Sequence, residues 1–133
     1  MNQAASPERL LTELDRTRIC RLPGRRLTPP LMDLLDTAEV LDARDIPADI
    51  VTMFSQVEIE NLHDGQRRTL TLCYPDHAEP HAGFISVLSP VGCALLGLRV
   101  GAIARWQLPG GESGAARVRA ILFQPEASGD YTL

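Results

Sequence analysis

The sequence contains no lysine: all 13 of its basic residues are arginine, set against 17 acidic residues, and the net charge is −4. Neither half of the chain is basic, since residues 1–50 hold 7 arginines and 9 acids and residues 51–133 hold 6 and 8. Binding to free nucleic acid by neutralising its phosphates is therefore poorly supported. We interpret the missing lysine as a bias of the source genome, although the rigid guanidinium fork would also suit salt bridges to a protein partner.

Cysteine is also scarce. Cys20, Cys73 and Cys93 lie far apart with no paired spacing, which indicates reduced thiols in a cytoplasm rather than a disulfide framework. No apolar run approaches the roughly 18 residues of a membrane-spanning helix, and the start of the chain is too polar for a signal peptide. The 133 residues, 44% of them hydrophobic, suffice for one compact domain with a small appendage.

The segment 84–97 predicts a strand followed directly by a short helix. Its first residues alternate in the manner of a strand, and apolar residues then recur at helical spacing. Ser89 suits the helix cap, and Pro90 suits the first helical position because its missing N–H costs nothing there. Gly97 supplies a C-terminal stop.

Residues 1–46 predict a short antiparallel helical hairpin, a truncated coiled coil. Ser6 caps the first helix, which runs to about residue 20 with Asp15 on its polar side. A break rich in proline and glycine follows. The second helix opens near Thr28 and carries an apolar stripe as far as Leu41.

Residues 47–133 predict mostly strands, with alternation near 57–60 and 69–73 and turns at 63–65 and 109–111. One short helix, the one that begins after Ser89, packs on a face of this antiparallel sheet. The fold class is therefore α+β, with two domains, residues 1–46 and 47–133.

Several motifs in order resemble one known family: SPVGCALLG, VG, WQLPGGE and VRAI, between residues 89 and 121, resemble the C-terminal domain of the GreA/GreB transcript-cleavage factors. The stretches PADIVTM at 47–53 and QPEASGDY at 124–131 resemble the Rnk branch of that family, the regulators of nucleoside diphosphate kinase. The resemblance implies an FKBP-like fold for residues 47–133. It also implies that this domain binds the rim of the secondary channel of RNA polymerase.

Within that resemblance, Ser89 and Pro90 match the Ser-Pro turn of the family. Gre factors have a polar residue before the serine, whereas this chain has Leu88. Leu88 is either an exposed apolar anchor or a residue that packs inside.

The family's catalytic feature is missing here. In Gre factors, acidic residues at the tip of a long coiled coil hold a magnesium ion at the polymerase active centre, a task that suits paired carboxylates. Each predicted helix here has at most about 15 residues, or roughly 22 Å. The turn between them carries Arg21, Arg25 and Arg26 and no acid. We therefore predict no transcript cleavage; the arginines either form a solvated turn or contact acidic polymerase residues or RNA phosphate.

Other candidate sites are weak. The loop 76–81 holds four potential metal ligands, but Pro80 argues against a helix and no distant residue completes a site. The hairpin at 109–111 lacks the features of a phosphate loop. A solvated surface is the simplest interpretation of the acidic residues of the second helix, with docking as the alternative: Asp33, Asp36, Glu39 and Asp42.

The sequence thus predicts a non-enzymatic cytoplasmic regulator that binds RNA polymerase near its secondary channel and competes with Gre factors, without a cofactor, a metal, a membrane contact or sequence-specific nucleic-acid binding. The alternatives are a protein that binds nucleoside diphosphate kinase or another metabolic enzyme and, less favoured, a prolyl isomerase, because a fold does not fix a function. The residues expected to contact the partner are Ser89, Pro90, Leu88, Arg25, Arg26 and Arg21.

Overall fold

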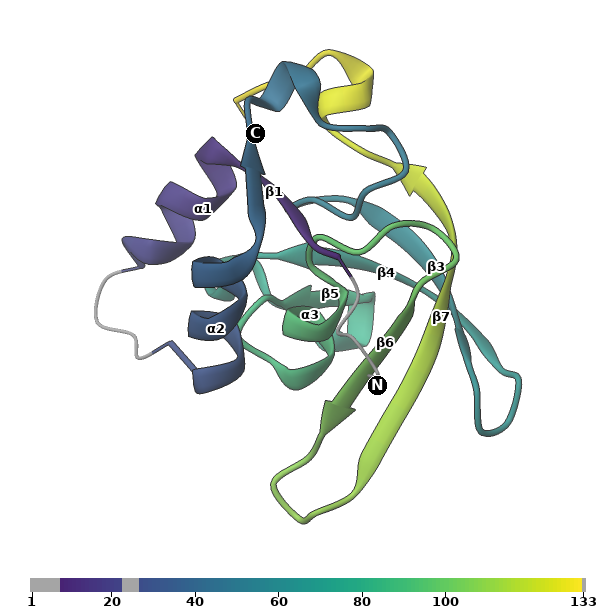
Figure 1. Ribbon diagram of the computed structural model, residues 1–133. Coiled ribbons are helices and arrows are strands. Elements are labelled where there is room, and N and C mark those ends of the chain that lie inside the picture. The colour runs from purple at the N-terminus through teal and green to yellow at the C-terminus, as the bar shows by residue number, and fades with distance from the viewer. Residues whose placement is uncertain (1–7, 23–26, 133) are drawn as a thin grey trace, which may run out of the picture.

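The computed structural model describes residues 8–22 and 27–132 (Figure 1). Its elements, in chain order, are β1 (Leu10–Thr12), α1 (Glu13–Cys20), α2 (Pro29–Thr37), β2 (Glu39–Leu41), β3 (Gln56–Asn61), β4 (Arg67–Cys73), β5 (Phe84–Ser86), α3 (Pro90–Leu95), β6 (Ile103–Gln107) and β7 (Ser113–Phe123). The described residues also form four short 3₁₀ turns, three between these elements and one after β7: η1 (Ala43–Asp45), η2 (Pro75–His77), η3 (Pro80–Ala82) and η4 (Glu126–Ser128).

The main sheet has five strands in the order β5-β4-β3-β7-β6, and β1 and β2 form a second, two-stranded sheet. The predicted α+β class is confirmed. The antiparallel sheet predicted for residues 47–133 is wrong at one pair, because β4 pairs with β5 in parallel. The parallel pair of β1 and β2 lies in the segment predicted to be helical. Two 3₁₀ turns, η2 and η3, fill the connection from β4 to β5 and carry the chain back across the sheet, which a parallel pair requires.

The sheet curls around α3 (Figure 1). The pairing of β3 with β7 shifts register twice, between Gln56 and Val57 and between Glu58 and Ile59. Such bulges bend a strand and increase its twist. Val57 and Ile59 are buried on the concave face, as their alternation predicts.

The first residues of the chain differ from the sequence prediction. Leu10–Thr12 forms a strand, so the first helix begins only at Glu13, and the second helix ends at Thr37. The reason is tertiary pairing: residues 10–12 lie in register with residues 39–41, and the Leu10 N–H donates to the Gly97 carbonyl at 3.1 Å. These long-range contacts override local helix propensity.

The predicted position of Asp15 on a polar face is also wrong, since only 1% of this residue is exposed. The reason is a tertiary contact: the Asp15 carboxyl group faces the core and accepts a hydrogen bond from the Met53 N–H. The start of the second helix is confirmed: the Thr28 hydroxyl accepts from the Leu31 N–H, and two prolines follow.

One core joins the two parts of the chain. Ile19 and Leu31, from α1 and α2, belong to the same buried cluster as Val57, Leu72 and Leu95 of the sheet and α3. Figure 1 shows α1 and α2 together on one side of the molecule, with α2 next to α3. Among the described residues, no helix combines the length and the apolar character needed to cross a membrane.

Candidate partner-binding groove

The turn before α3 has the structure that its sequence predicts. The Ser89 hydroxyl accepts from the Gly92 N–H at 3.1 Å and donates to the Ser86 carbonyl at 2.7 Å. Pro90 opens the helix, and Gly97 follows its end with φ +82°. The Ser89 side chain is therefore engaged within the chain, and the exposed surface of this turn comes from Pro90.

Gly92 lets α3 lie directly on the end of β5. A Cβ at this position would stand 2.1 Å from the Ser86 carbonyl oxygen and 3.1 Å from a methyl group of Leu72. Real Cβ atoms do not approach a backbone oxygen so closely, so only glycine allows this contact. The close approach fixes the position of the Ser-Pro turn relative to the sheet.

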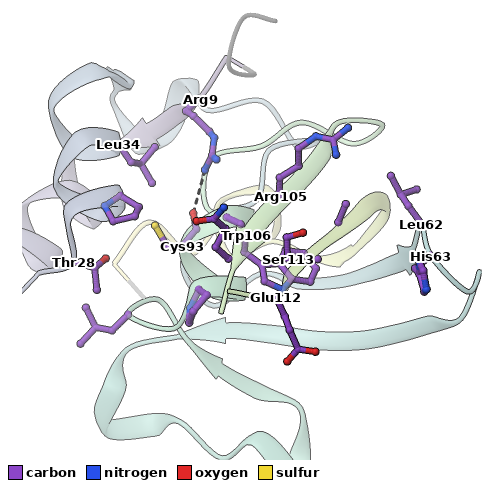
Figure 2. Close-up of a pocket in the computed structure, with 17 residues that line it drawn as sticks. Arg9, Thr28, Leu34, Leu62, His63, Cys93, Arg105, Trp106, Glu112 and Ser113 are labelled. Atoms are coloured by element: carbon purple, nitrogen blue, oxygen red, sulfur yellow. Dashed lines mark hydrogen bonds between the residues drawn. The ribbon is translucent and has the colours of Figure 1, made fainter. Parts of the chain in front are cut away.

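A groove of about 1080 Å³ opens beside this turn (Figure 2). α2 and α3 form one side, and the β6–β7 hairpin with the end of β3 forms the other. The residues that line it are Arg9, Thr28, Pro30, Leu34, Leu62, His63, Leu88, Pro90, Cys93, Ala94, Arg105, Trp106, Gln107, Glu112, Ser113, Gly114 and Ala115.

Trp106 is the aromatic side chain among these lining residues. It pairs across the hairpin with Gly114, and a Cβ on Gly114 would lie 2.5 Å from three atoms of the indole. The indole thus rests on glycine backbone, which fixes its orientation. The result is a rigid aromatic surface in the groove, formed before any partner arrives.

Arg9 connects the start of the chain to the end of α3, beside the groove. Its guanidinium donates to the Cys93 carbonyl at 3.1 Å (Figure 2). It also donates to the Leu96 carbonyl at 2.7 Å, where the end of α3 leaves carbonyls free. Burial lowers the pKa of Arg9, and the Cys93 thiol opposes this shift. Arginine nevertheless stays protonated in proteins, so Arg9 contributes positive charge to the groove.

The predicted contact residues separate into three groups. Leu88 and Pro90 line the groove, and Ser89 between them caps α3. Leu88 is half-buried and also packs against the core, so both alternatives for it hold in part. Arg21 is exposed at the end of α1 and is not among the groove residues. Arg25 and Arg26 lie outside the described residues.

The groove offers little for catalysis. Burial raises the pKa of the Cys93 thiol, which disfavours a nucleophilic thiolate. In the part of the chain that the structure describes, no group of three or more histidine, cysteine or acidic side chains could hold a metal ion. The groove also has few of the aromatic side chains expected of a prolyl isomerase pocket. Phe54 and Tyr74 lie outside it and pack against each other, with their ring centroids 5.5 Å apart.

Two features that shape this groove were not predicted from the sequence: Arg9 and the Trp106–Gly114 pair. The pair had a signal, since Trp106 and Gly114 stand equally far on either side of the predicted 109–111 turn. Arg9 had none, because its partners lie more than 80 residues further along the chain.

Residues 46–122 match the family described as "Transcription elongation factor, GreA/GreB, C-term". The chain belongs to the GreA/GreB family. Within the family it is 41% identical to the "Regulator of nucleoside diphosphate kinase" of Escherichia coli strain K12, over 96% of this chain and 98% of that protein. It is 38% identical to GreA of Desulfovibrio desulfuricans, over 55% of this chain and 45% of that protein.

Solved structures of GreA/GreB proteins have the same fold. A GreA/GreB factor from Nitrosomonas europaea superposes with a TM-score of 0.71 at 34% identity, covering 89% of this chain and 100% of that one. The GreA factor homolog Gfh1 of Thermus thermophilus, at 22% identity, covers 87% and 99% with a TM-score of 0.50, which concerns the fold alone. These relatives are named as regulators and transcription factors rather than as enzymes.

Proposed function

We propose that this GreA/GreB-family protein is a non-enzymatic regulator of transcription that binds RNA polymerase at the rim of its secondary channel. The single observation that carries the proposal is the position of Leu88 and Pro90. Pro90 belongs to the turn that is matched to the family's Ser-Pro turn, and Leu88 directly precedes that turn. Both line the groove that also contains Trp106. Such a regulator would work in the cytoplasm, where the polymerase is.

The groove has the composition of a protein-binding hot spot. Trp106 offers a large flat surface, and tryptophan and arginine are enriched among the residues that dominate binding energy. Leu62, 42% exposed, extends the apolar surface on the far side of the groove. Because Gly92 and Gly114 hold the groove in shape, little ordering is needed when a partner binds, and a preformed site keeps more of its contact energy.

The same protein would not support transcript cleavage. Its helices α1 and α2 have 8 and 9 residues, so they are about 12 and 14 Å long. Ile19 and Leu31 bury these helices against the sheet rather than leaving them free to project far from it. The connecting sequence carries arginine and no carboxylate to hold magnesium. We expect the protein to occupy the binding site of Gre factors without delivering their metal.

We also propose that residues 47–133 have an FKBP-like fold and that residues 1–46 are a truncated coiled coil. These two ranges would be the two domains of the chain. A role for Arg21, Arg25 and Arg26 in touching acidic polymerase residues or RNA phosphate completes it.

A second candidate function is direct binding to nucleoside diphosphate kinase. It is favoured by the name of the Escherichia coli relative, which is 41% identical over nearly the full chain. Direct binding and an indirect effect through transcription would both fit that name. Co-purification of the kinase without polymerase would support the direct contact.

The decisive experiment is equilibrium binding of fluorescently labelled protein to bacterial core RNA polymerase, with and without GreB as competitor. Trp106→Ala removes the aromatic surface and should weaken binding at least about tenfold, the scale of a hot-spot residue. Leu88→Ala should weaken it less. Leu122→Ala is the matched control, because Leu122 is 55% exposed and lies outside the groove.

Saturable binding that GreB displaces and Trp106→Ala weakens supports the proposal. No binding at tens of micromolar would overturn it and bring the kinase forward. Binding that survives both substitutions would retain the polymerase as partner but contradict the groove as its docking surface.

A further inference from the structure

Two sequence motifs that the groove does not use meet on the other side of the core. The Gln124 amide donates to the carbonyls of Pro47 and Ile50, both at 2.8 Å. The Thr52 hydroxyl donates to a carboxylate oxygen of Glu126 at 2.7 Å. The stretches 47–53 and 124–131, 70 residues apart in the chain, are therefore bonded to each other through buried polar groups.

Helix α1 places a third partner in this cluster. Asp15 is 1% exposed, and its Oδ2 accepts from the Met53 N–H at 3.1 Å. Its Oδ1 is also buried and has no hydrogen-bond partner among the described residues. A buried carboxylate with one unpaired oxygen is costly when ionised, whereas a neutral carboxyl tolerates the same site.

The charges around Asp15 come from three elements. Glu126 approaches from η4, the Tyr74 side chain follows β4, and Arg18 lies one turn further along α1. Burial raises the pKa of Asp15 to about 7; the Met53 hydrogen bond opposes this shift, Glu126 adds to it, and Thr12 and Arg18 weaken it slightly. Arg18 is exposed and donates to the Thr132 carbonyl at 2.8 Å, so it does not neutralise Asp15 closely.

The other two acidic groups do not compensate Asp15. Burial raises the pKa of Glu126 as well, the Thr52 hydrogen bond opposes this, and Asp130 adds a smaller increase. Burial, with a contribution from Asp15, raises the pKa of Tyr74, so its phenol stays neutral. Every acid near Asp15 therefore favours its protonated form.

We infer that Asp15, Thr52 and Glu126 form a proton-dependent latch, in which a neutral Asp15 keeps helix α1 seated on the Thr52–Met53 segment and its ionisation loosens the helix. Arg21, at the end of α1, would gain freedom with it. The latch acts through α1 and does not depend on the proposed polymerase contact.

The direction of the effect follows from linkage. Asp15 binds its proton more tightly in the folded protein than in the unfolded chain, where its pKa is near 4. The stability that it contributes is therefore complete below about pH 4 and is lost as the pH rises through about 7. Between pH 5 and pH 8 the folding equilibrium constant should fall about tenfold or more from this group.

The first test follows the Asp15 carboxyl carbon by NMR across a pH titration of the intact wild-type chain. We expect a midpoint near 7, and a midpoint near 4 would overturn the latch. In parallel, hydrogen exchange of the α1 amides, corrected for intrinsic exchange, should be about tenfold faster at pH 8 than at pH 5.5. Those α3 amides that exchange by local opening rather than by global unfolding should change much less.

The second test uses Asp15→Asn, which mimics the neutral carboxyl. It should keep α1 protected and remove most of the pH dependence of unfolding. Asp36→Asn, an exposed aspartate on α2, is the matched control and should leave the dependence unchanged. If Asp15→Asn retains the wild-type pH dependence, the latch is wrong. Should that variant fail to fold, Glu126→Gln must still reduce the dependence, and an unchanged slope there overturns the latch equally.

Discussion

Helices α1 and α3 pack against the same core through opposite kinds of contact. α3 packs against the end of β5 through Gly92, which has no side chain, and its buried residues are apolar or small. α1 sits partly through a buried acid, Asp15, bonded to backbone. Close packing without a buried acidic side chain gives a fixed geometry, as the groove requires. Because a buried carboxyl group holds α1 in part, the attachment of α1 depends on pH.

The position of each helix suits this difference. α3 carries the Ser89–Pro90 turn into the groove, so a displacement of α3 would alter the proposed docking surface directly. α1 lies away from the groove, and none of its residues lines it. A protein can therefore keep a rigid binding surface and still have an adjustable helix, provided that the two are held by different chemistry.

The largest effect is expected where α3 meets the sheet. Gly92→Ala places a Cβ against the Ser86 carbonyl and should lower the free energy of unfolding by about 3 kcal/mol or more, since overpacking against backbone leaves little room to relax. Urea unfolding measures it. Gly110→Ala, with open space around the added methyl group, should change stability by less than about 1 kcal/mol. Equal losses in the two variants would refute the close seat of α3.

The second-largest loss of stability is expected where α1 packs against the core through apolar side chains. Ile19 is fully buried, so Ile19→Ala should cost about 2 to 4 kcal/mol through lost burial and a cavity. Because no charge is involved, the loss should be the same at pH 5.5 and pH 8 by urea unfolding. Met32→Ala, at a residue 50% exposed, should have little effect. A strongly pH-dependent loss at Ile19 would contradict the assignment of the titration to Asp15.

The cap of α3 should have the smallest effect. Ser89→Ala removes the hydrogen bonds to Gly92 and Ser86 and should cost about 1 kcal/mol, the usual value of an N-cap. Thermal unfolding at both pH values should show the same loss. Thr37→Ala, which removes an exposed hydroxyl bonded within α2, is the control and should cost less. A loss at Ser89 as large as that of Gly92→Ala would mean that the cap, not the glycine contact, holds α3.

The sequence predicted the α3 junction well because its signals are local. A serine cap, a proline at the first position and a glycine stop act within a few residues, and the structure contains all three. The 57–60 alternation and the 109–111 hairpin were predicted for the same reason. Family membership also followed from short motifs in order and is confirmed by the match over residues 46–122.

The N-terminal segment could not be predicted this way. Leu10 and Leu11 fit an amphipathic helix in isolation, but pairing with residues 39–41 and a bond to Gly97 make them a strand. Asp15 turns inward through a tertiary contact as well, because its carboxyl group accepts from the Met53 N–H. Neither outcome has a local signal, because the partners come from the far end of the domain.

By itself, then, the sequence determined the α+β class, the capped α3 junction, the turns and the family, since each depends on neighbouring residues or on motif order. Only the tertiary structure decided that Leu88 and Pro90 meet Trp106 in a groove, and that Glu126 and Asp15 bind the neighbouring residues Thr52 and Met53. The physical reason is that burial is set by what packs on a residue, and the residues that pack here lie more than 15 positions away in the chain.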